Sequence, residues 1–174
     1  MQLKACDIFF THGEGALSKA IRWFSRSPGE AKTETNHVGI VVDDGTLENA
    51  GVVEALSHVR YGTLPARYRG KRDTVSVWRP ANLTKKERAA IVSKARGYIG
   101  RDYGWLKLGL HALGLQRFAK LDKWPICSYL VGKAYGVVGK GFGRDGNELT
   151  PDDILDFCQA NPDKYKEVMP WTQL

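Results

Sequence analysis

Apolar and β-branched residues are concentrated in the first half of the chain, in segments that predict short β-strands. These segments are 37–42, 51–64 and 73–78, and the turn signals DDG and YRGKRD lie between them. A further short apolar run, 7–10, is followed by the turn-like sequence THGEG. We expect the three longer segments to form a small antiparallel meander.

Helical spacing of apolar residues replaces the strand pattern elsewhere in the chain. The predicted helices are 16–25, 83–100, 124–138 and a last one that begins at Thr150. Thr84 and Glu87 have the spacing of a capping box, and Pro151 follows Thr150 at the first helical position. Strands combined with helices in this order predict an α+β fold, with a small antiparallel sheet or half-barrel packed against helices.

Length and composition limit the architecture and the partners. A chain of 174 residues with 43% hydrophobic content suffices for one sizeable core, so we expect a single domain over 1–174. The net charge of +7 favours acidic partners such as cell-wall polymers, anionic lipid headgroups or nucleic acid. A solvated basic surface explains the same charge, which therefore does not choose among these partners.

The sequence shows neither an export signal nor a membrane span. Its start, MQLKACDIFF, lacks the long apolar region and the cleavage site of a signal peptide. No stretch approaches the roughly 18–20 consecutive apolar residues of a transmembrane helix. We expect a cytoplasmic protein, unless it is phage-encoded or leaves the cell by a route that needs no signal peptide. The three cysteines, an odd number, argue against a disulfide scaffold.

Cys127 and His37 are candidates for a nucleophile and its base. Cys127 falls in the first turn of a predicted helix, where free backbone N–H groups and the helix dipole favour a thiolate. His37 opens an apolar strand and shares a strand face with Gly39, which leaves room for another group to approach the ring. The alternatives are a cysteine that packs as a small hydrophobe and a histidine that is only solvated or hydrogen-bonded.

Glu54 is a candidate for the residue that orients the histidine. It lies between apolar residues on its predicted strand, where a carboxylate needs a partner to offset its burial. If the strands of Glu54 and His37 are neighbours, the carboxylate can fix the tautomer of the ring, as the third member of a catalytic triad does. The alternative is a glutamate on an edge strand that faces water.

Other motifs argue against a metal, a cofactor or a nucleic-acid site. The remaining histidines, His12, His58 and His111, lack zinc-binding spacing, and there is no CxxC pair, so we expect no metal. The sequence GFGRDG follows a predicted helix rather than a strand, so we expect no dinucleotide cofactor. The short basic pairs KR and KK are typical of a solvated surface, and we expect no specific binding of nucleic acid.

Several segments together resemble the circularly permuted papain-like hydrolases of the NlpC/P60 superfamily, the YiiX/YebB-like group. They are CDIFFTHGEGALSKAIRWFSRSP, NHVGIVV, VVEAL, GYIGRDYGWL, ICSYLVGKAYG and LTPDDI. The histidine strand precedes the cysteine helix, as in the permuted group. The resemblance implies a permuted papain-like fold with Cys127 as nucleophile, His37 as base and Glu54 as orienting acid. It also implies Tyr103 as a residue that lines the site, where its phenol can donate to an oxyanion. Relatives often carry an acidic residue at the position of Tyr129, so we expect an altered pocket wall.

We therefore expect a cysteine hydrolase that acts on peptide amides, such as cell-wall crosslinks, through a thioacyl-enzyme. The basic charge predicts a preference for substrates with a free acidic group, weakened by salt. Lecithin-retinol acyltransferase-like proteins share the permuted topology, so the same triad acting on an acyl ester or lipid is the enzymatic alternative. The apolar segment 105–115 suits a lipid substrate too. A ligand-binding module without turnover is the third hypothesis.

Overall fold

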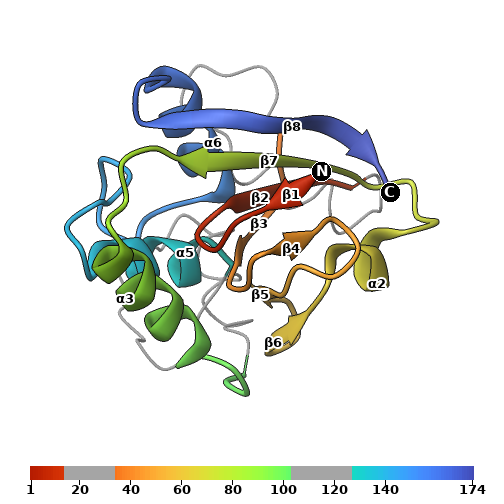
Figure 1. Cartoon of the computed structure of the whole chain (residues 1–174), viewed down its shortest axis with the longest axis horizontal. Helices are drawn as coiled ribbons and strands as arrows, with labels where there is room; N and C mark the ends of the chain where they lie inside the picture. The colour runs from red at the N-terminus through yellow and green to blue at the C-terminus, as the bar shows by residue number, and fades with distance from the viewer. Residues whose placement is uncertain (14–33, 103–126) are drawn as a thin grey trace.

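A six-stranded antiparallel sheet organises the chain, for which the computed structural model describes residues 1–13, 34–102 and 127–174. Its strands are β2 (Ile8–His12), β3 (His37–Val41), β5 (Val52–Ala55), β6 (Val59–Gly62), β7 (Thr74–Pro80) and β8 (Tyr165–Gln173). They lie in the order β6-β5-β3-β2-β7-β8, with every neighbouring pair antiparallel (Figure 1). A separate pair of two-residue strands joins β1 (Gln2–Leu3) to β4 (Gly45–Thr46).

Helices cover the sheet, so the expected α+β class is confirmed. The described helices are α2 (Leu64–Tyr68), α3 (Lys85–Arg96), α5 (Cys127–Gly136) and α6 (Pro151–Ala160) (Figure 1). Two caps agree with the sequence: Thr84 forms a capping box with Glu87, and Thr150 forms one with Asp153. No helix in the described ranges is both long and apolar enough to cross a bilayer.

The predicted meander is only partly correct. Strands β3, β5 and β6 do follow one another across the sheet, but β7 pairs with β2 and not with β6. Strand β2 has fully buried residues from Ile8 to Phe10 and is bonded on both sides, to β3 and to β7. Burial of an apolar strand requires partners for its backbone groups at both edges, so β2 takes a central position.

The strand β8 has no counterpart in the sequence prediction. Its alternation is weak because Pro170 interrupts it and the strand is partly exposed. It lies at the edge of the sheet, and its pairing with β7 contains irregularities on both sides of Val77. An edge strand tolerates both features, since one row of its backbone groups has no ladder to maintain.

Two apolar clusters lie on opposite faces of the sheet, and each face of β3 contributes side chains to a different cluster. Val38 and Ile40 belong to a core that also contains buried residues of α3, α5 and α6. Val41 belongs to the second core, together with Phe9 and with Leu64 of α2. The period of two along β3 thus sends alternate side chains to different helices.

Some sequence predictions lie outside the described residues. These are the helix 16–25, the first residues of the helix 124–138, the apolar segment 105–115 and Tyr103. Helix α3 ends earlier than its pattern suggests, at Arg96, so that Tyr98 lies in the following turn.

Gly39 accommodates an aromatic ring beside the histidine. A Cβ atom at Gly39 would collide with the edge of the Phe9 ring and lie 3.1 Å from the Val53 carbonyl oxygen. The Phe9 ring is fully buried and contacts the ring of His37 edge-on, with centroids 6.3 Å apart. The space that the sequence predicted beside His37 therefore exists, and a core side chain fills it.

We expect Gly39→Ala to destabilise the protein by about 1–3 kcal/mol, since the added methyl must displace a packed ring. The matched control is Gly62→Ala in β6 of the same sheet, where a Cβ atom meets nothing within 4 Å. Chemical denaturation of both variants measures the difference. Equal stability of the two would contradict the close packing of Phe9 on Gly39.

Candidate active site

The three residues singled out as nucleophile, base and orienting acid meet where β3 and α5 begin. Helix α5 packs against β3 and has Cys127 as its first residue, and His37 is the first residue of β3. Glu54 lies on the next strand, β5, where it pairs with Gly39. All three are buried, with exposed fractions of 5% for Cys127, 6% for His37 and 4% for Glu54.

The thiol of Cys127 is in an environment that favours its ionised form. Burial opposes a thiolate, but a hydrogen bond and the positive charge of His37 outweigh it. Backbone hydrogen bonds from Val38 on β3 and from Ser128 on α5 add to this effect. The net result is a pKa of Cys127 below its usual value.

His37 links the thiol to the carboxylate. Its Nε2 lies 3.1 Å from Glu54 Oε2, and its ring also forms a hydrogen bond with Cys127. Burial alone would lower the pKa of His37, but its bonds to the two acidic partners raise the pKa to about 10. A raised histidine pKa and a lowered cysteine pKa both favour the thiolate–imidazolium pair over the neutral thiol and imidazole.

Glu54 is held as a charged carboxylate by groups from three elements. Burial favours the neutral form, yet the bonds and charge of His37 lower the pKa of Glu54, with help from Tyr68 and Arg67. The Tyr68 hydroxyl donates to Oε2 at 2.6 Å, and Arg67 Nε lies 3.1 Å from Oε1. Arg60 approaches Oε1 from β6, at 3.8 Å.

Sequence reasoning missed Tyr68, Arg67 and Arg60. Arg60 leaves a weak signal, because a β5–β6 hairpin places it directly opposite Glu54. Tyr68 and Arg67 belong to the short helix α2, whose sequence shows no helical spacing of apolar residues. The expectation that Glu54 needs a partner was correct, but only the structure identifies the full set of partners.

The other candidate residues have separate surroundings. Tyr129 is buried, with its ring edge-on to Tyr98 at 6.1 Å between centroids, so it forms part of the packing behind the first turn of α5. Burial raises the pKa of Cys6 to about 12 and also raises that of Cys158. These two thiols are therefore protonated at neutral pH, whereas the pKa of Cys127 is shifted in the opposite direction.

The fold is similar to that of a solved structure of YiiX from Escherichia coli O157:H7, which is described as a metalloprotein with the designation DUF1105. The TM-score is 0.57 at 24% sequence identity, over 79% of this chain and 67% of YiiX. No protein-family model matches the sequence. No curated protein matches it either. The likeness establishes a shared fold and confirms the expected YiiX-like architecture.

We expect a thiol-alkylating reagent such as iodoacetamide to label Cys127 selectively at about pH 6, because only its thiol has a lowered pKa. Labelling should weaken as pH falls through the lowered pKa of Cys127. In His37→Ala the cysteine loses its cationic partner, so half-maximal labelling should move to higher pH. Mass spectrometry of the labelled peptides measures both effects. Comparable labelling of all three cysteines at about pH 6 would contradict the ion pair.

We expect Tyr68→Phe to lower the free energy of unfolding by about 1.5–3 kcal/mol near neutral pH, since it removes a bond to a buried charged group. A carboxyl group whose pKa is lower in the folded than in the unfolded protein stabilises the fold at pH values above its unfolded pKa. This stabilisation is lost as the pH falls through the folded pKa. The difference in the free energy of unfolding between wild type and variant should therefore decrease at acidic pH. The control is Tyr61→Phe, which loses a 2.9 Å bond to exposed Asp43 and should change stability less. Denaturant titrations at several pH values test this.

Proposed function

We propose that the chain is a cysteine hydrolase that cleaves peptide amides, with Cys127 as nucleophile, His37 as general base and Glu54 as orienting acid. One observation carries the proposal: a buried hydrogen-bonded series runs from a thiol of lowered pKa, through an imidazole, to an ionised carboxylate. A cysteine that merely fills the core needs no such series, as the protonated thiols of Cys6 and Cys158 illustrate.

The proposed reaction uses the ion pair directly. The Cys127 thiolate attacks the amide carbonyl carbon, and the resulting oxyanion is stabilised by backbone N–H groups at the start of α5. His37 then gives its proton to the leaving amine as the C–N bond breaks, which leaves a thioester on Cys127. A water molecule transfers a proton to His37 and attacks the thioester, which releases the acid and restores the thiolate and the imidazolium.

Glu54 supports these steps through its fixed position and charge. Tyr68 and Arg67 hold its two oxygens, so that Oε2 faces the His37 ring and stays ionised. A fixed carboxylate orients the imidazole and stabilises its protonated form without taking the proton itself. Tyr103, which lies outside the described residues, is proposed to line the site and donate to the oxyanion.

The substrate class follows from the resemblance to the permuted papain-like proteins of the NlpC/P60 superfamily. We propose peptide amides of the kind found in cell-wall crosslinks. An acyl ester or lipid substrate would use the same three residues, and the apolar segment that would form an acyl groove lies outside the described residues. The rates of amide and ester cleavage distinguish these two substrate classes.

A metal has no place in the proposed mechanism, although YiiX is described as a metalloprotein. Glu54 is the only carboxylate described at the site; its Oε2 already accepts from Tyr68 and His37, and its Oε1 forms an ion pair with Arg67. Nowhere in the described ranges does a group of three or more His, Cys, Asp or Glu residues form a possible metal site. The donor set at Cys127 thus fits an ion pair better than a bound cation.

We expect Cys127→Ala to lower turnover of a short peptide amide by about 10³-fold or more, because the nucleophile is lost. Cys158→Ala is the matched control, since Cys158 is another buried helical cysteine, and it should keep its activity. Circular dichroism verifies that both variants fold, and a chromogenic leaving amine reports the rate. Acyl esters of increasing chain length form the comparison set. Cleavage only of esters, at a rate that climbs with chain length, would favour the lipid substrate, and equal loss in both variants would point to packing.

A further inference from the structure

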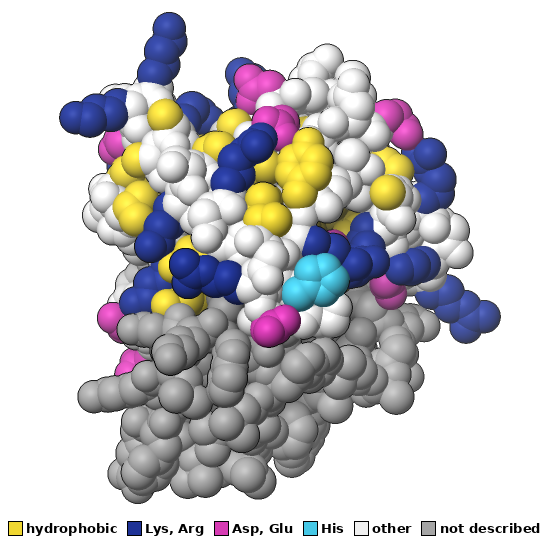
Figure 2. Space-filling view, turned by 90° about the horizontal axis from the view of Figure 1, so that it is seen from below, with side chains coloured by type: hydrophobic (Ala, Val, Ile, Leu, Met, Phe, Trp, Pro, Cys, Tyr) yellow, Lys and Arg dark blue, Asp and Glu magenta, His cyan; other side chains and the backbone are white. Residues whose placement is uncertain are grey.

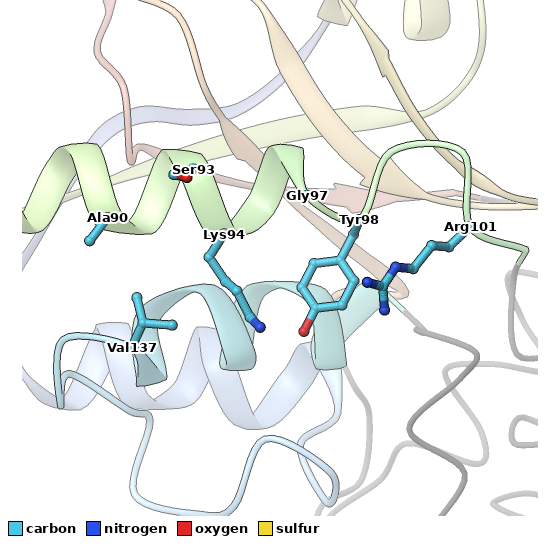
Figure 3. A pocket seen from close by; sticks show the side chains of 7 residues that line it. All are labelled: Ala90, Ser93, Lys94, Gly97, Tyr98, Arg101 and Val137. Atoms are coloured by element: carbon cyan, nitrogen blue, oxygen red, sulfur yellow. The ribbon is translucent and has the colours of Figure 1, made fainter.

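A buried polar side chain, that of Asn36, lies next to the base of the proposed reaction. Asn36 immediately precedes His37, the first residue of β3, and is only 7% exposed. The pocket beside α3 in Figure 3 has none of Cys127, His37 and Glu54 in its lining. Lysine and arginine side chains spread over the described surface in Figure 2, so positive charge alone does not mark a site. Asn36 therefore offers a contact beside the triad that neither this pocket nor the surface charge provides.

The carboxamide of Asn36 has a defined orientation. The backbone N–H of Gly13, which follows β2, donates to Asn36 Oδ1 at 2.7 Å in a buried hydrogen bond. A backbone N–H group can only donate, so the atom that it contacts is the oxygen of the carboxamide. The nitrogen Nδ2 therefore points away from Gly13 and has two hydrogens to donate.

Nδ2 of Asn36 has no hydrogen-bond partner within residues 1–13, 34–102 and 127–174. Asn161 differs in this respect, because its Nδ2 donates to the Phe157 carbonyl oxygen at 2.8 Å. Buried polar groups in native proteins are nearly always paired, and an unpaired one costs stability. A donor that is unpaired and more than nine-tenths buried is therefore suited to an acceptor that a ligand brings.

The backbone that carries Asn36 is held in place on both sides. The Asn36 N–H donates to the Thr11 carbonyl oxygen of β2 at 3.0 Å. The fully buried Thr35 hydroxyl lies 2.9 Å from that same oxygen and 3.0 Å from the His37 carbonyl oxygen. These bonds fix the position of the carboxamide relative to the base. A donor that is fixed before binding loses less conformational entropy when the ligand arrives.

In the proposed reaction, Asn36 lies on the side of the leaving amine. Cys127 and the backbone N–H groups at the start of α5 act on the acyl carbon and its oxygen, whereas His37 gives its proton to the amine. The leaving half of the substrate therefore begins at the His37 ring, and Asn36 is the next residue at the entrance of β3. The first acceptor beyond the amine of a peptide is the carbonyl oxygen of the following amino acid.

We infer that the Asn36 carboxamide donates a hydrogen bond to the first carbonyl group of the leaving half of the substrate. This inference rests on the proposed hydrolase function and adds a substrate-binding residue that selects peptides over simple amides. A leaving amine without that carbonyl group leaves the buried donor unpaired, and a site built around a hydrogen bond discriminates against such a substrate. Nδ2 takes no part in proton transfer.

The kinetic test uses two substrates that share the acyl half of the chromogenic peptide amide. In one the leaving amine is alaninamide, which has a carbonyl group, and in the other it is p-nitroaniline, which has none. Asn36→Ala should lower the ratio of kcat/KM for the alaninamide substrate to that for the anilide by roughly threefold to tenfold, mainly through KM. Asn36→Asp should lower this ratio at least as much, because a carboxylate still accepts from Gly13 but has no hydrogen to donate. Chromatography of the released acid measures both rates.

The matched control is Asn49→Ala, which should keep the wild-type ratio. Asn49 is exposed, and its Oδ1 also accepts from a backbone N–H, that of Thr46 at 2.7 Å. The ratio does not depend on the fraction of enzyme that is folded, so a destabilised variant still gives an answer. An unchanged ratio in both Asn36 variants, or an equal fall in the control, overturns the inference and leaves the hydrolase function standing. If kcat falls equally with both substrates, Asn36 acts on the acyl half, which also overturns it. Turnover of neither substrate by the wild type overturns the proposed function and this inference with it.

Discussion

The arrangement of the site depends on one buried charge, that of Glu54. A carboxylate removed from water is costly unless cations and donors surround it, and here the partners come from separate elements. His37 reaches it from β3, Tyr68 and Arg67 from α2, and Arg60 from β6. The charge therefore requires β3, β5, β6 and α2 to keep one mutual arrangement, which also fixes the imidazole.

The thiol reaches this arrangement from the other layer of the fold. Helix α5 packs on the face of β3 that bears Val38 and Ile40, and Cys127 at its start bonds to His37 and to the backbone of Val38. The helix thus supplies the thiol and part of the field that lowers its pKa, and the strand supplies the imidazole. The chain order, with the histidine strand first, imposes no obstacle because only the spatial meeting matters for the chemistry.

Charged side chains in the described residues differ in whether they have a partner of opposite charge. Charges beneath the surface, such as Glu54 and Asp7, have cationic partners that offset their burial. Among the described residues, Lys94 and Arg101 contact the Tyr98 ring and have no acidic partner. Cys127, His37 and Glu54 are buried, and an environment without water strengthens the interactions among them.

The sequence by itself determined the local elements and the chemical types: the strands at His37 and Glu54, the caps at Thr84 and Thr150, and a helix that contains Cys127. Each of these features depends on the spacing of apolar residues or on a helix cap, and residues close together in the sequence specify both. Tertiary structure alone decided that β2 separates β3 from β7, that β8 closes the edge, that Phe9 fills the space at Gly39, and that Tyr68 and Arg67 hold Glu54. Those contacts join residues distant in the chain, so packing and the pairing of buried charge select them, and no local pattern records the choice.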